Sequence, residues 1–344
     1  MRRWPMTCAG TRVPVGGPAP RNVDDGYPIG GRRLAAPPVR EEIDQALEWL
    51  LTDVTCDGGE FVTALETAFA RRMGEGVHAV AVQSGSAAEF LTLKALGIGP
   101  GDEVITVPNS DLATTSAISH SGAAFVLVDI DPQTHTIDPV RIEAAITPRT
   151  RAVVPVHMYG LPAELDAILE VARRHNLFVI EDATPALGAE YRGAMVGTVG
   201  DAGFFSFAPR KVLGGTGNGG MVVTRDSALA RNVRLLRAYG LPAENEPPVA
   251  RRLAATGSGH VMEGYNLKLD PIQAAVIGPK FAHLDAWAAL CQHVADRYGE
   301  RLHDVPEIVT PEVPDSMRHA WRSYVITIPQ RDRVRAALRE KGIA

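Results

Sequence analysis

The sequence predicts an α/β protein built around a mostly parallel sheet. Short apolar runs rich in β-branched residues recur between residues 77 and 182, and helical stretches separate them. Parallel strands need such crossover connections, whereas antiparallel strands can be joined by tight hairpins. No internal repeat is visible. No apolar run approaches the ~20 residues of a membrane helix, so we expect no membrane partner.

Two helices are predicted before the sheet. The apolar residues from Val39 to Leu51 share one helical face, and "ALETAFARRMG" (64–74) ends in a glycine after two arginines, as helices commonly do. Residues 1–24 are rich in Pro, Gly and Arg without periodicity, so we expect a flexible extension there.

Strands and helices then alternate along the chain. A strand is also expected at "GMVVT" and a helix at "ALARNVRLLRAYG", and a long helical pattern runs from Asp270 to "GERL". The tail from Trp321 indicates one strand and one helix. The predicted strands up to residue 182 are "VHAVAVQ" (77–83), "DEVITVP" (102–108), "AAFVLVDI" (123–130), "RAVVPVH" (151–157) and "LFVIED" (177–182).

We therefore expect three parts: an extension over 1–24, a large domain over 25–258, and a smaller C-terminal α+β domain over 259–344 that ends early. The net charge of -5 provides no basic face for nucleic acid. The three cysteines are too few and too widely spaced for a disulfide framework or a metal site, which favours a cytoplasmic location. The arginines at the start lead into no apolar stretch, so we expect no signal peptide.

The stretch "SFAPRKVLGGTGNGG" (206–220) places Lys211 between an apolar strand and a run of glycines. A dinucleotide-binding loop needs a helix after its glycines, but a strand is predicted there. A P-loop has its lysine after the glycines, not before them. Both nucleotide interpretations are therefore disfavoured, and Lys211 is left as a surface charge, a phosphate ligand or a covalent anchor.

Two other segments could bind a ligand. Ser84, Gly85 and Ser86 lie where a strand gives way to a helix, a place where free N–H groups favour an anion, although taken alone a simple N-cap is the favoured interpretation. Glu181 and Asp182 end a buried strand at the sheet edge where ligands bind in open α/β folds, although a turn cap is an equal alternative. His157 ends another strand, and a packing role is favoured for it.

Together these segments match the needs of pyridoxal phosphate. Its aldehyde requires a lysine, its ring nitrogen a carboxylate, and its phosphate a helix N-terminus. No metal is required.

The chain resembles the DegT–DnrJ–StrS family of pyridoxal-phosphate-dependent sugar aminotransferases, which have the type I (aspartate aminotransferase) fold. The resemblance covers residues 27–344. The matching segments are "SGSAAEFLTLKALGIGPGDEVITVP", "GAAFVLVDIDPQTHTIDPVRIEAAITPRTRAVVPVHMYGLPAELDAI", "HNLFVIEDATPALGA", "GDAGFFSFAPRKVLGGTGNGGMVVT" and "GYNLKLDPIQAA".

The resemblance implies roles for single residues. Lys211 would form the Schiff base with the cofactor, and Asp182 would pair with the pyridinium nitrogen. Gly85, Ser86 and Ser206 would hold the phosphate. Asn266 would reach the cofactor of a neighbouring subunit, which makes a homodimer part of the active site.

Several positions depart from the family pattern. Leu112 stands where an aromatic residue usually stacks on the cofactor ring, and it can cover the ring only by dispersion. Pro185 replaces a Gln or His that addresses the phenolic oxygen. Asn218 replaces an acidic residue, Lys268 an arginine and Pro271 a glutamate.

The expected activity is amino transfer from glutamate or glutamine to a keto-sugar nucleotide or keto-cyclitol. Such a reaction would serve the biosynthesis of secondary metabolites or surface sugars. One alternative is a pyridoxal-phosphate enzyme that dehydrates or rearranges such a sugar, and the retained Lys211 argues against it. The other is a cofactor-binding regulator without catalysis.

Overall fold

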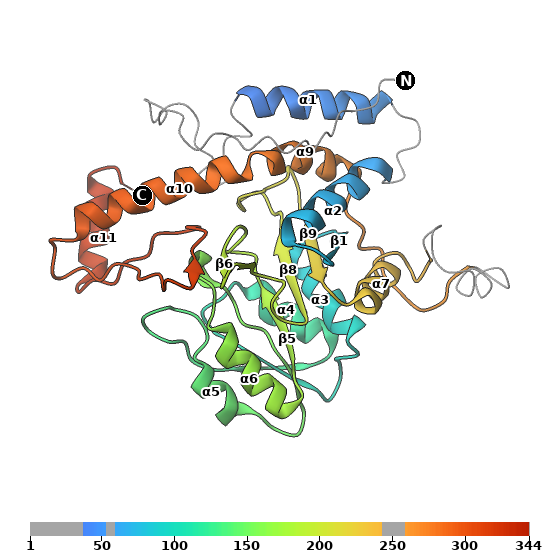
Figure 1. Ribbon diagram of the computed structural model, residues 1–344, viewed down its shortest axis with the longest axis horizontal. Helices are drawn as coiled ribbons and strands as arrows, with labels where there is room; N and C mark the ends of the chain where they lie inside the picture. Colours follow the sequence, from blue (N-terminus) through green and yellow to red (C-terminus); the bar gives the residue numbers. More distant parts are fainter. Residues whose placement is uncertain (1–36, 53–58, 243–258, 344) are drawn as a thin grey trace.

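The computed structural model describes residues 37–52, 59–242 and 259–343 (Figure 1). The expected flexible extension over 1–24, Cys8 and Cys56 lie outside these residues, as does the proposed domain boundary at 258. In the described part of the chain, no helix is long and apolar enough to span a membrane.

A seven-stranded sheet forms the centre of the molecule, in the order β1-β9-β8-β5-β4-β2-β3. Strands β3, β2, β4, β5 and β8 pair in parallel, which confirms the predicted α/β architecture. The strands are β1 (His78–Val82), β2 (Glu103–Thr106), β3 (Ala124–Leu127), β4 (Thr150–Val153), β5 (Phe178–Asp182), β8 (Ala202–Ser206) and β9 (Gly220–Thr224).

Strand β9 pairs antiparallel with both β1 and β8. It therefore returns along the sheet directly after the glycine-rich stretch, as predicted, and a dinucleotide-binding loop at that place is excluded. In this register Gly220 lies opposite Val82 of β1 and Ser206 of β8.

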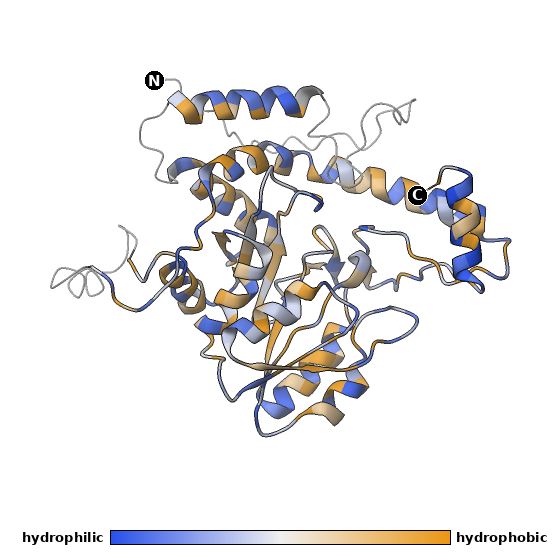
Figure 2. Cartoon of the chain, turned by 180° about the vertical axis from the view of Figure 1, so that it is seen from behind, coloured by the Kyte–Doolittle hydropathy of each residue, from blue (hydrophilic) through white to orange (hydrophobic). Residues whose placement is uncertain are grey.

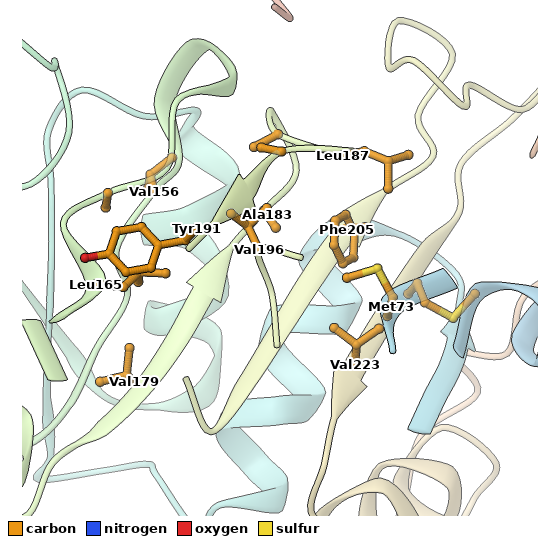
Figure 3. Packing of buried hydrophobic residues seen from close by; sticks show 14 of the residues in the cluster. Met73, Val156, Leu165, Val179, Ala183, Leu187, Tyr191, Val196, Phe205 and Val223 are labelled. Atoms are coloured by element: carbon orange, nitrogen blue, oxygen red, sulfur yellow. The ribbon is translucent and has the colours of Figure 1, made fainter. Parts of the chain in front are cut away.

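Helices cover both faces of the sheet because its buried strands present apolar side chains alternately to each side. On one face lie α3 (Gly85–Ala95), α4 (Leu112–Ser121) and α7 (Ser227–Leu236), packed around Ile180 and Phe204. On the other lie α2 (Gly59–Met73), α5 (Pro139–Ala145) and α6 (Leu165–His175). Figure 3 shows part of this second core, in which Met73 of α2 lies beside Phe205 and Val223.

The C-terminal part begins with α9 (Pro271–Ala282), which packs on α2 and on α1 (Pro37–Thr52). The single long helix expected from Asp270 is divided at His283 into α9 and α10 (Leu284–Leu302). Figure 1 shows α10 running outward to α11 (Arg331–Glu340), in which no residue is buried. Figure 2 shows hydrophobic residues gathered in the central strands, with many hydrophilic residues on the outer helices.

The strand expected in the described tail from Trp321 is absent. An isolated β-bridge pairs Thr327 with Val309 there. The extended segment instead hydrogen-bonds to the loop after β4, where the Ser323 N–H donates to the carbonyl of Tyr159. A small antiparallel sheet joins the two parts in the order β10-β6-β7. Its strands are β6 (Glu190–Tyr191), β7 (Ala194–Met195) and β10 (Met317–Arg318).

Candidate active site

Asp182 ends β5 with a buried and fully oriented carboxylate. Its Oδ1 accepts hydrogen bonds from the Thr184 N–H at 3.1 Å and the Thr184 hydroxyl at 2.6 Å. Its Oδ2 accepts one from the Thr114 hydroxyl of α4 at 3.1 Å. Two hydrogen bonds from Thr184 and one from Thr114 therefore fix the orientation of this carboxylate. A carboxylate that pairs with a cationic group of a ligand needs such a fixed orientation.

Glu181, the neighbouring carboxylate, has a different environment. Its oxygens accept the N–H groups of Gly197, Val199 and Gly200 at 2.7 to 2.8 Å. His157 Nε2 donates to Glu181 Oε2 at 2.9 Å, because His157 Nδ1 already accepts from the Ala163 N–H. Both side chains are wholly buried and satisfied, so the pair stabilises the loops at this end of the sheet.

Glu89 is an acid of the site that the sequence did not indicate. It lies on α3, one turn beyond Gly85, with 1% of its surface exposed. Its Oε1 has no hydrogen-bond partner among the described residues. Burial, and then the charge of Asp182, raise the pKa of this carboxyl well above its usual range. Burial beside Asp182 therefore favours the protonated form of Glu89.

A cradle forms where the N-terminus of α3 meets the ends of β8 and β9. A Cβ on Gly85 would lie 2.7 Å from Ser206 Cβ, and one on Gly220 would lie 2.3 Å from the Ser84 carbonyl oxygen. Only glycine allows the three backbones to approach so closely. The Ser84 side chain is an N-cap that accepts from the Ala87 N–H at 3.0 Å. The helix thus has its cap, and Ser86 remains exposed at its first turn.

Lys211 lies on the turn between β8 and β9. Its N–H donates to the Ala208 carbonyl at 2.8 Å, and its own carbonyl accepts from the Gly214 N–H at 3.0 Å. These bonds fix the backbone on both sides of the lysine. The half-buried side-chain amine has no hydrogen-bond or ion-pair partner in the described part of the chain, so it is available to a ligand.

Two side chains of helix α9 form hydrogen bonds with the backbone of the glycine-rich turn. Lys280 Nζ donates to the Gly214 carbonyl at 2.5 Å, and burial lowers the pKa of this amine. Gln273 Oε1 accepts from the Gly217 N–H at 2.8 Å. A Cβ on Gly215 would lie 2.4 Å from the same oxygen, so a larger residue there would displace the Gln273 side chain. Neither Gln273 nor Lys280 was indicated by the sequence, because a residue on an amphipathic helix gives no sign of the loop it contacts.

The structure gathers most of the predicted residues at one edge of the sheet. Ser206 and Asp182 end adjacent parallel strands, and Pro185 lies three residues beyond Asp182. Leu112 begins α4, the helix that reaches Asp182 through Thr114, and 77% of its surface is exposed.

Asn266 is exposed, and no hydrogen bond joins its side chain to this group in the described part of the chain. Asn266 forms a β-bridge with Ala238. Lys268, two residues further on, forms another with Val82 of β1. Asn218, whose side chain is exposed, has no contact in the structure that explains its presence.

Comparisons with known proteins agree with this geometry. The DegT/DnrJ/EryC1/StrS aminotransferase family matches residues 37–344. The chain is 42% identical over 305 residues to the erythromycin biosynthesis sensory transduction protein EryC1 of Saccharopolyspora erythraea, covering 89% of this chain and 80% of that protein.

Two further relatives support the match. An Acidithiobacillus ferrooxidans protein named UDP-N-acetyl-3-dehydro-alpha-D-glucosamine 3-aminotransferase is 39% identical over 317 residues, covering 92% of this chain and 82% of its own. The crystal structure of S. venezuelae DesV with a ketimine intermediate has a TM-score of 0.81 at 39% identity, covering 89% of this chain and 79% of DesV.

Proposed function

The chain belongs to the DegT/DnrJ/EryC1/StrS aminotransferase family, and on that premise we propose that it moves an amino group from glutamate or glutamine to a keto-sugar nucleotide or keto-cyclitol. It is a pyridoxal-phosphate-dependent aminotransferase with the type I fold. The A. ferrooxidans relative is named for amination of a UDP-linked keto-sugar, which supports the substrate class. The product would enter the biosynthesis of a secondary metabolite or a surface sugar.

The residues present fit the cofactor. Gly85 and Gly220 bring the ends of β8 and β9 against the first turn of α3, and a helix N-terminus is suited to a phosphate. In this proposal Gly85, Ser86 and Ser206 hold the phosphate, and Asp182 faces the ring nitrogen. Lys211 is the covalent anchor. When bound, pyridoxal phosphate supplies an electron sink for the negative charge that develops on the substrate carbon.

The chain's own groups would divide the proton transfers between them. Lys211 Nζ, which has no competing partner in the described residues, would take the proton from the donor's α-carbon and return it to the cofactor's former aldehyde carbon. Asp182 would keep the ring nitrogen protonated, while Thr114 and Thr184 hold the Asp182 carboxylate in place. The raised pKa of Glu89 disfavours a second negative charge beside Asp182.

Leu112 and Pro185 would lie against the cofactor ring without the stacking or the hydrogen bond that an aromatic residue and a Gln or His would provide. The exposed side chain of Leu112 at the start of α4 supports a covering role by dispersion.

The assembly we propose is a homodimer in which Asn266 reaches the partner's cofactor. The exposed position of Asn266 supports this, as do apolar side chains left open near it. Those side chains are Tyr239, Leu241, Met262, Tyr265 and Ile272. The division into a large domain over 25–258 and a small one over 259–344 remains a proposal. So does a cytoplasmic location, which the sparse and widely spaced cysteines support.

The observation that carries the proposal is the convergence of the unpartnered Lys211, the oriented Asp182 and the glycine cradle at one sheet edge. The test is absorbance spectroscopy of the cofactor-loaded protein during titration with glutamate or glutamine, followed by a panel of keto-sugar nucleotides. We expect conversion to the amine form by the donor and its reversal by a ketone. Lys211→Ala should abolish both steps. A protein that binds cofactor but never reaches the amine form would instead be a dehydratase or a regulator.

A further inference from the structure

We propose that Arg322 binds the α-carboxylate of the amino donor. The inference rests on the proposed aminotransferase function, for which it names the donor subsite.

Arg322 reaches the turn of the anchor lysine from the C-terminal part of the chain. Its Nη2 donates to the carbonyl of Arg210 at 2.8 Å, across 112 positions of sequence. Arg210 is the residue directly before Lys211, so the guanidinium lies at the peptide bond that leads into the lysine. One amine donor is used in this contact, and the other donors of the planar fork remain for a ligand.

The segment that carries Arg322 is held firmly. The Ala320 N–H donates to the Gly160 carbonyl at 2.8 Å, and the Ser323 N–H donates to the Tyr159 carbonyl at 3.1 Å. A Cβ on Gly160 would lie 3.0 Å from the Arg322 nitrogen, so the two backbones are in close contact.

Side chains reinforce this placement. The ring of Trp321 stacks on His319, with centroids 4.0 Å apart and planes 13° from parallel. Trp321 Nε1 donates to Gln292 Oε1 of α10 at 2.7 Å. Arg322 is therefore presented by a fixed backbone, which lowers the entropy lost when it binds a ligand.

The cations around Lys211 are uncompensated. Arg210, Lys211 and Arg322 form no ion pair with any carboxylate in the described part of the chain. Arg318, four residues earlier on the same segment, is by contrast paired with Glu190 at 2.9 Å. The guanidinium of Arg322 lies at the peptide bond between Arg210 and Lys211, and no acid is paired with any of these residues, which favours an anionic ligand.

The chemistry of the donor selects which anion this is. In any α-amino acid the amine and the α-carboxylate are bonded to the same carbon, so an amine that reaches Lys211 brings its carboxylate to the same place. The phosphates of a sugar nucleotide are separated from a ring ketone by several bonds. A guanidinium matches a carboxylate with two parallel hydrogen bonds, which suits Arg322 to this role.

The experiment compares cofactor-loaded wild type with Arg322→Gln and Arg322→Lys in the donor half-reaction, followed by absorbance. Arg318→Gln, which removes a charge from the same segment, is the matched control. The donors are L-glutamate, L-glutamine, which lacks the side-chain carboxylate, and L-isoglutamine, which lacks the α-carboxylate. UDP and dTDP are added as inhibitors, and the thermal midpoint of each cofactor-free protein is measured.

We expect Arg322→Gln to raise the donor concentration for half-maximal rate by about tenfold or more for both glutamate and glutamine, as loss of a charge-assisted contact implies. Isoglutamine should react poorly with wild type and be little changed by the substitution. Arg322→Lys should recover only part of the loss, Arg318→Gln should behave as wild type, and the thermal midpoint should move little.

Four results would overturn the inference. Unchanged donor dependence would leave Arg322 as a structural contact, and a loss matched by a large fall in the thermal midpoint would point the same way. A loss for glutamate alone would show that Arg322 binds the side-chain carboxylate instead. A change confined to inhibition by UDP or dTDP would show that Arg322 binds the nucleotide. If wild type converts no donor, the proposed function itself fails, which is a separate outcome.

Discussion

Glu181 and Asp182 are neighbours in β5 whose side chains point to opposite faces of the sheet, since successive residues of a strand alternate. Glu181 faces the loops of the small sheet and binds three backbone N–H groups and His157. Asp182 faces α4 and the cradle. Two identical functional groups in adjacent positions therefore have different roles, which the environment of each decides.

The two acids should respond differently to amidation. Asp182→Asn should change the free energy of unfolding by less than about 1 kcal/mol, because the amide oxygen can still accept from Thr184 and the amide N–H can donate to the Thr114 hydroxyl, yet slow the donor half-reaction by about 100-fold or more. Glu181→Gln places an amide against N–H donors and should cost about 3 kcal/mol of stability. Urea unfolding of the cofactor-free proteins and single-turnover absorbance measure the two effects. Equal behaviour of the two variants would contradict this division.

His319 gives the cofactor-free protein an acid-sensitive stability. Its ring is buried, and its Nδ1 accepts the Trp321 N–H at 2.7 Å. Burial lowers the pKa of His319 from 6.5 to about 4. Because the folded-state pKa is depressed, the stabilisation is fully present above pH 6.5 and is lost as the pH falls toward 4.

The size of this effect follows from the linkage. Between pH 7 and pH 5 the unfolded chain gains a proton at His319 that the folded protein does not bind, at a cost of about 2 kcal/mol. His319→Gln cannot titrate and should lose that much less stability over this interval than wild type. Urea unfolding at the two pH values measures the difference. Parallel losses in the two proteins would show that His319 does not titrate in this way.

At the scale of elements, the connection from β8 through the lysine turn to β9 organises the site. The register places Gly220 between Val82 and Ser206, so that β9 lies directly against the backbone of Ser84 and Gly85. Helix α9 fixes the turn through Gln273 and Lys280. The lysine is therefore held by one pair of strands and one helix.

Gly220→Ala should separate β9 from the start of α3. The added Cβ would meet the Ser84 carbonyl at 2.3 Å and the Gly85 nitrogen at 2.8 Å, both of them backbone atoms. We expect a loss of about 1 to 3 kcal/mol in unfolding free energy, together with weaker cofactor binding. Urea unfolding and cofactor titration by absorbance measure the two.

The matched control is Gly299→Ala in α10. There the new Cβ would lie 3.9 Å from the Tyr324 hydroxyl, an ordinary van der Waals distance, within a helix. It should stabilise the protein by about 0.5 to 1 kcal/mol and leave cofactor binding unchanged. Unaltered cofactor affinity in Gly220→Ala would contradict the proposed cradle.

At the scale of the whole molecule, two residues of the proposed site are exposed to solvent in the single chain. Leu112 is largely exposed, and Asn266 is exposed as well. A site shared between two copies of the chain would account for both observations. The proposed homodimer can be tested by restoring one site from two inactive proteins.

Lys211→Ala and Asn266→Ala should each be inactive or weak alone. If Asn266 serves the partner's cofactor, mixed dimers contain one site with both native residues, and random mixing should recover about a quarter of wild-type activity. The proteins are mixed under mild denaturation, refolded, and assayed by the donor half-reaction, with sedimentation confirming the dimer. No recovery from a mixture that is shown to be dimeric would place Asn266 in its own subunit's site.

The sequence predicted the parts of this fold whose cause is local. Apolar β-branched runs indicated strands β1 to β5, and the strand after the glycines was correctly expected at β9. The break at His283 and the missing strand after Trp321 were not predicted. Both depend on which neighbour each segment packs against. The packing of α9 on α1 and the hydrogen bond from Ser323 to Tyr159 leave no pattern in the local sequence.

By itself, the sequence determined the α/β class, the glycine turn beside Lys211 and the carboxylate pair that ends β5, because residue type and spacing fix local chemistry. Only the tertiary structure decided which carboxylate faces the cradle, placed the buried Glu89 beside it, and brought Gln273, Lys280 and Arg322 to the lysine turn. These contacts join residues from 50 to more than 100 positions apart. They depend on how the layers pack around the sheet, which no local periodicity encodes.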